Sequence, residues 1–86
     1  MSQNPSMNAA EARASLEQLC DITHGNNPSQ PAPSRWIAEL HEILEAITTR
    51  EAASVYRLDG MTGVTMQYLH NRVLDVLRDF DHLVAE

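Results

Sequence analysis

One apolar repeat in the C-terminal third of the chain constrains the fold more than any other feature. Apolar residues recur there at intervals of three and four positions: Met66, Leu69, Val73, Val76, Phe80 and Leu83. This spacing places them along one face of an α-helix. Gly60 can end a preceding helix in the left-handed conformation, and Thr62 can cap the next one. The pattern therefore predicts a helix over residues 62–84.

A shorter helix is predicted near the N-terminus. Asn8 and Glu11 have the spacing of a capping box, and the apolar stripe that follows ends just before Gly25, so we expect a helix over about residues 9–23. Residues 25–33 hold three of the four prolines and indicate a linker. The polar residues 1–7 indicate a disordered N-terminus. The chain is thus predicted to carry one small helical domain, residues 8–86.

The length of the second helix depends on the stretch around Thr48. Apolar residues keep a helical spacing from Ser34 to Ile47, and the same phase continues to Leu58. Thr48 and Glu51 also have the spacing of a capping box, which would start a new helix. We favour one continuous helix over residues 34–58, because no Gly or Pro interrupts it and each threonine costs roughly a few tenths of a kcal/mol.

The two long helices are expected to form an antiparallel hairpin around Gly60. Counting outward from this turn, apolar residues face each other at nearly every level, and the exception is Glu51, which falls opposite His70. If buried together, the pair would share a charge-assisted hydrogen bond that fixes the register and favours the protonated histidine. Stability would then fall as pH rises through the histidine's pKa. Alternatively, both side chains lie in water at the edge of the seam.

The predicted hairpin is longer than the helix over residues 9–23, so part of its apolar surface is expected to remain uncovered. Small helical chains often bury such surface against a second copy. We therefore predict an all-α, homodimeric helical bundle, in which the first helix packs on its own hairpin or is swapped onto the partner subunit. The expected interface residues are Trp36, Ile43, Leu74, Leu77, Leu16 and Leu19.

Charge and motifs argue against several classes of function. The net charge is −6, with twelve acidic residues and six arginines, and an acidic domain lacks the phosphate contacts on which nucleic-acid binding depends. The four histidines form no metal-binding motif: His41 with Glu45 and Asp79 with His82 have helical ligand spacings, but such pairs are usually solvated charge contacts. Cys20 is alone, and no nucleophile or phosphate-loop motif is present. We expect no catalytic residue, no metal, no cofactor and no enzymatic activity.

By exclusion, the sequence predicts a protein–protein interaction module, a homodimeric regulator, antagonist or adaptor that binds another protein. The alternative is a helix-turn-helix-like regulator that binds nucleic acid, with a short helix over residues 51–58, a turn at residues 59–61 and a recognition helix that begins at Thr62. Neither an N-terminal signal segment nor an apolar run of about eighteen residues is present, which predicts a cytoplasmic protein without membrane contact.

Overall fold

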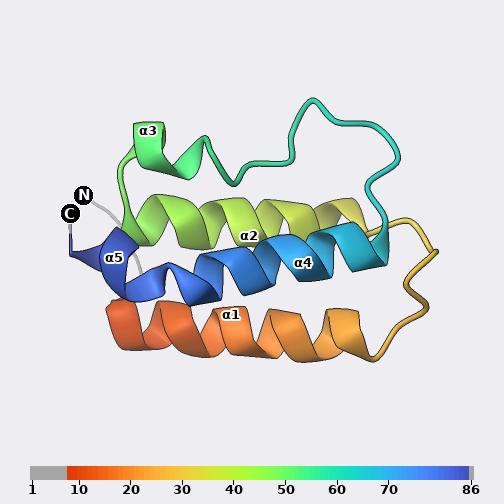
Figure 1. The fold of residues 1–86 in the computed structure, drawn as a ribbon, viewed down its shortest axis with the longest axis horizontal. Coiled ribbons are helices and arrows are strands. Elements are labelled where there is room, and N and C mark those ends of the chain that lie inside the picture. The colour runs from red at the N-terminus through yellow and green to blue at the C-terminus, as the bar shows by residue number, and fades with distance from the viewer. Residues whose placement is uncertain (1–7, 86) are drawn as a thin grey trace.

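The computed structural model describes residues 8–85. Three long helices lie side by side, and two single-turn helices follow α2 and α4 (Figure 1). The elements are α1 (Ala9–His24), α2 (Ser34–Ile47), α3 (Arg50–Ala53), α4 (Met66–Arg78) and α5 (Phe80–Val84). The predicted all-α class is confirmed. The predicted disorder of residues 1–7 lies outside the described residues.

The capping box at the start of α1 is confirmed. The side chain of Asn8 accepts a hydrogen bond from the backbone N–H of Glu11 at 2.8 Å, and the Glu11 carboxylate accepts one from the backbone N–H of Asn8 at 3.0 Å. These bonds satisfy two backbone donors that the first turn of a helix leaves free. At the other end, Gly25 caps the helix, so α1 matches the predicted span within one residue.

The second helix does not continue to Leu58, so this prediction was wrong. α2 ends at Ile47, and Thr48 is extended, with φ −152° and ψ 176°. The side-chain hydroxyl of Thr49 then accepts a hydrogen bond from the backbone N–H of Ala52 at 3.1 Å and starts the single turn of α3. The local cap therefore prevails over the helical phase of the apolar residues. The N-cap is Thr49, one position after the threonine that the sequence pattern indicated.

The antiparallel hairpin is also wrong, because α2 and α4 run in the same direction. Both helices begin at the linker: Met66 donates its backbone N–H to the carbonyl oxygen of Gln30 at 2.7 Å, and Ala32 donates to Val64 at 2.9 Å. α1 is antiparallel to both (Figure 1). The expected tight turn is instead a long connection over residues 54–65, which runs back along the bundle.

The start of the last long helix also differs from the prediction. α4 begins at Met66 and is capped by Thr65, whose hydroxyl accepts from the backbone N–H of Tyr68 at 3.2 Å, rather than by Thr62. Gly60 and Gly63 both have positive φ values, 83° and 70°. Two left-handed positions in four residues keep the chain in an irregular path up to Thr65.

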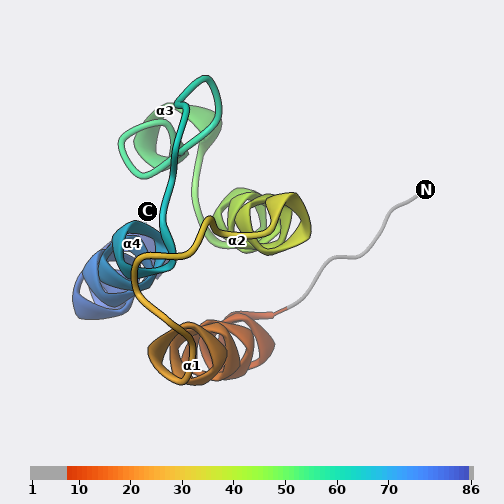
Figure 2. The same ribbon diagram turned by 90° about the vertical axis from the view of Figure 1, so that its right-hand side faces the viewer.

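The connection takes the side of the bundle opposite α1. In Figure 2, α1 lies below α2 and α4, and α3 and the connection lie above them. Leu58 and Val64 of the connection are buried, as are the apolar faces of α1, α2 and α4. The chain therefore covers both sides of its own core. No helix among residues 8–85 is long and apolar enough to span a membrane.

Candidate functional site

The predicted interface residues do not form one surface. Leu16, Leu19 and Ile43 are fully buried inside the single chain, where they pack in its core, so they are not available to a second copy. Trp36 and Leu77 are half-buried against that core. Leu74 is exposed, with 44% of its surface accessible. Within the single chain, α1 and the connection cover these three residues more completely than a hairpin would.

Glu51 and His70 are not brought together. Glu51 is exposed on α3, whereas His70 lies on α4 with its Nδ1 atom 2.9 Å from the hydroxyl oxygen of Thr23 on α1. Because α2 and α4 are parallel, the antiparallel register that would place Glu51 opposite His70 is not formed.

His70 belongs instead to a small polar group at the C-terminal end of α1. The Thr23 hydroxyl is 2.9 Å from the carbonyl oxygen of Leu19, and the Sγ atom of Cys20 is 3.9 Å from Nδ1 of His70. The His24 ring lies beside the His70 ring, with 5.5 Å between their centroids. A shallow cavity of about 240 Å³ opens beside these side chains.

The chemistry of this group is limited by the state of its thiol. Burial raises the pKa of Cys20, and the nearby charges of Asp21 and Glu17 raise it further. The thiol is therefore protonated at neutral pH and is a poor nucleophile. Within the part of the chain that the structure describes, no three His, Cys, Asp or Glu side chains gather closely enough to hold a metal ion.

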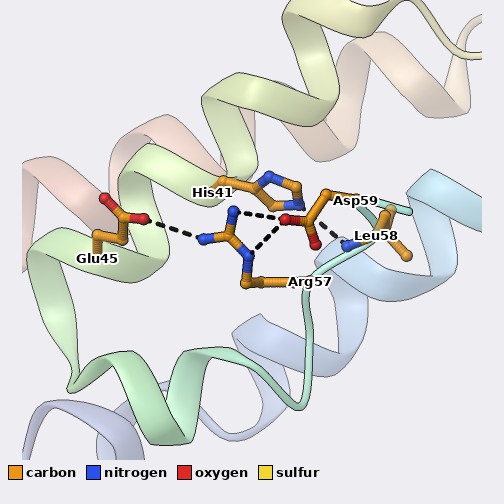
Figure 3. Close-up of polar contacts among 5 residues, drawn as sticks. All are labelled: His41, Glu45, Arg57, Leu58 and Asp59. Atoms are coloured by element: carbon orange, nitrogen blue, oxygen red, sulfur yellow. Dashed lines mark hydrogen bonds and ion pairs between the residues drawn. The ribbon is translucent and has the colours of Figure 1, made fainter. Parts of the chain in front are cut away.

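A second polar cluster attaches the connection to α2 (Figure 3). Arg57 on the connection donates from Nη1 to the carboxylate of Glu45 on α2 at 2.9 Å. It also donates from Nη2 to the carboxylate of Asp59 at 2.8 Å and from Nε to the same oxygen at 3.1 Å. One guanidinium thus holds two carboxylates, one from each element.

His41 on α2 completes this cluster. Its Nε2 atom accepts a hydrogen bond from the backbone N–H of Leu58 at 3.0 Å (Figure 3). An imidazole accepts only through an unprotonated ring nitrogen, so His41 is neutral here and its proton is on Nδ1. Burial lowers the pKa of His41, and the positive charge of Arg57 lowers it further, against the opposing effects of Asp59 and Glu45.

Sequence reasoning missed the roles of His41, Arg57 and Asp59. Their contacts join α2 to a segment whose course depends on the helix break at Thr48 and Thr49. The spacing of His41 and Glu45 was visible as a helical pair, but it gave no sign that an arginine twelve residues later would bind there.

The helix-turn-helix geometry is not formed. The helix expected over residues 51–58 is the single turn of α3, and the connection over residues 54–65 replaces the short turn that such a motif requires. The recognition helix expected from Thr62 begins at Met66. The nucleic-acid alternative therefore loses the geometry on which it depended.

Comparison with known proteins gives no match: no family model, no curated protein and no solved structure matches this chain significantly.

Proposed function

We propose that this chain is a protein-interaction module that binds a basic surface of another protein, as a regulator, antagonist or adaptor. The observation that carries the proposal is the distribution of charge. The net charge is −6, and four of the six arginines form ion pairs with carboxylates of the chain itself. These four are Arg13, Arg57, Arg72 and Arg78. The positive charge is thus largely compensated within the chain, and the excess at the surface is negative.

Several exposed carboxylates form no ion pair with any described residue. They are Asp21, Glu39, Glu42, Glu51 and Asp81. Glu39 and Glu42 lie one turn apart on α2, so they project from the same exposed side of that helix. Complementary charge accelerates the association of two proteins and selects among partners. A basic partner is therefore favoured over an acidic one.

The test is capture of partners from an extract of the native host, with the purified chain as bait. Retained proteins should be basic, and they should be released at about 1 M salt, where the Debye length falls to about 3 Å. A bait with Glu39→Gln and Glu42→Gln should retain them less well than the wild type. Retention that is insensitive to salt, or a set of acidic partners, would contradict the proposal.

Self-association is the second part of the proposal. Leu74 is exposed and Leu77 is half-buried one turn later on the same side of α4, which leaves an apolar strip on that helix. A twofold axis along this strip would bury it in a homodimer. Light scattering at several protein concentrations tests this part, and a monomer at all concentrations would remove it.

A further inference from the structure

The connection covers the core on the side of α2 and α4 that α1 does not reach (Figure 2). Leu58 is its most deeply placed side chain, with 1% of its surface exposed. The polar contacts that attach this part of the connection to α2 are the hydrogen bond from Leu58 to His41 and the ion pair from Arg57 to Glu45. Both lie within the cluster of Figure 3.

The first of these contacts requires a neutral imidazole. A protonated His41 would present a second N–H to the backbone N–H of Leu58, and two donors cannot share a hydrogen bond. The positive Arg57 lies close by and opposes a second positive charge. Asp59 and Glu45 would favour that charge, but both already bind Arg57. Protonation therefore replaces an attraction by a repulsion at this point.

We propose that residues 57–60 are an acid-released flap: protonation of His41 at Nε2 breaks the hydrogen bond from Leu58 and loosens this part of the connection from α2, while the ion pair from Arg57 to Glu45 remains. The charged groups that face His41 are Arg57 and Asp59 from the connection and Glu45 from α2. The inference concerns a movement within the chain and does not depend on the proposed function.

The release is local, because the ends of the connection are held by contacts without a histidine. Tyr56 donates its phenolic O–H to the carboxylate of Asp79 near the end of α4 at 2.7 Å. Val64 accepts a backbone hydrogen bond from Ala32 at 2.9 Å. The packing of α1 against α2 and α4 lies on the other side of the core. An open flap therefore exposes Leu58 and the apolar surface beneath it while the three long helices stay together.

Amide hydrogen exchange of the whole chain, measured by NMR, tests the flap. The measured quantity is the protection factor of the Leu58 amide, the ratio of its intrinsic to its observed exchange rate at each pH, which removes the intrinsic effect of pH on exchange. This factor should fall about threefold or more between about pH 7.5 and pH 5, on either side of the usual histidine pKa of about 6.5. The amide of Leu16, in the buried face of α1, should keep its protection factor. A protection factor of Leu58 that does not change with pH would overturn the proposal.

Two variants separate His41 from the other histidines. In His41→Gln, the amide oxygen can replace Nε2 as the acceptor but does not titrate, so Leu58 protection should become independent of pH. His24→Gln alters an exposed histidine on α1 and should keep the wild-type response. If His41→Gln still responds to pH as the wild type does, the proposal fails.

A third measurement covers the case in which His41→Gln does not fold. The ring resonances of His41 in the wild-type protein report its own protonation. Because the open flap leaves His41 with its usual pKa and the closed flap lowers it, Leu58 protection should begin to fall above the midpoint of these resonances and level off below it. A loss of protection that begins only below this midpoint would show that another group controls the flap.

Discussion

The carboxylate of Asp79 is shared between Tyr56 of the connection and Arg78, the last residue of α4. Tyr56 donates its O–H to Oδ2 at 2.7 Å, and Arg78 donates from Nε to Oδ1 at 3.3 Å. The guanidinium of Arg78 lowers the pKa of Asp79, and the phenol lowers it further. Burial raises the pKa of Tyr56, and so does the hydrogen bond to Asp79. The connection is thus joined to α4 by a bond to a charged acceptor.

Tyr56→Phe removes this bond and keeps the ring. We expect a loss of about 1 kcal/mol in the free energy of unfolding, the usual contribution of a partly exposed hydrogen bond. Urea denaturation followed by circular dichroism measures it. Tyr68→Phe is the matched control, because Tyr68 is exposed and its hydroxyl forms no hydrogen bond with a described residue. Equal losses in the two variants would contradict the role of Tyr56.

The pH dependence of stability follows from His41. Because its pKa is lower in the folded state than in the unfolded chain, the unfolded state binds more protons near that pKa. The contribution of His41 is therefore fully present above about pH 6.5 and is lost as pH falls toward the folded-state pKa. Urea midpoints measured between about pH 8 and pH 5 should decrease, and His41→Gln should reduce this decrease.

The sign of this dependence also distinguishes the structure from the sequence-based hypothesis. A buried pair of Glu51 and His70 would make the protein less stable as pH rises. The His41 contact makes it less stable as pH falls. A rise in the urea midpoint on acidification through this range would therefore contradict the assignment of His41 as the neutral acceptor.

The two adjacent threonines should respond differently to substitution by valine. The Thr49 hydroxyl caps α3, so Thr49→Val should cost about 1 kcal/mol. The Thr48 hydroxyl is buried and has no hydrogen-bond partner among the described residues, so Thr48→Val should be neutral or stabilising. Thermal or urea denaturation of both variants checks the order. Equal destabilisation would mean that the cap of α3 contributes nothing.

Two leucines of the predicted interface should differ in how much their replacement by alanine destabilises the protein. Leu16→Ala opens a cavity in the core and should cost about 2–5 kcal/mol, enough to unfold a marginal domain. Leu74→Ala removes an exposed side chain and should change stability by about 0.5 kcal/mol or less. Under the proposal of self-association, Leu74→Glu should shift a dimer to monomers in light scattering while the helical signal is retained. A dimer that persists in Leu74→Glu would place the contact elsewhere.

Structural features that depend on residues close together in the sequence could be predicted. The capping box at Asn8 and Glu11 is formed as expected. The periodic residues of the C-terminal third are all buried, although the helix predicted to continue to residue 84 is interrupted at Asp79. Met66, Leu69, Val73 and Val76 lie on α4, and Phe80 and Leu83 lie on α5.

The arrangement of the helices could not be predicted in this way. Broad apolar faces match in several registers and in both directions, so agreement across the supposed hairpin carried little information. Whether the helix continues or breaks depends on Thr48 and Thr49. Their helix propensities cost little, which permits a continuous helix, but a threonine side chain can also cap a new helix, which favours a break. The cluster of His41 and Arg57 depends on that break, because a continuous helix over residues 34–58 would not bring Arg57 back to α2.

The parallel course of α2 and α4 has a consequence for the order of folding during synthesis. α1 packs more extensively on α4 than on α2, although α4 is the long helix farthest from it in the sequence. During synthesis, the apolar face of α1 is therefore fully covered only after α4 has been made. A nascent chain that stalls within the connection would present that face to chaperones and proteases, so translation must reach the last long helix before the protein is protected.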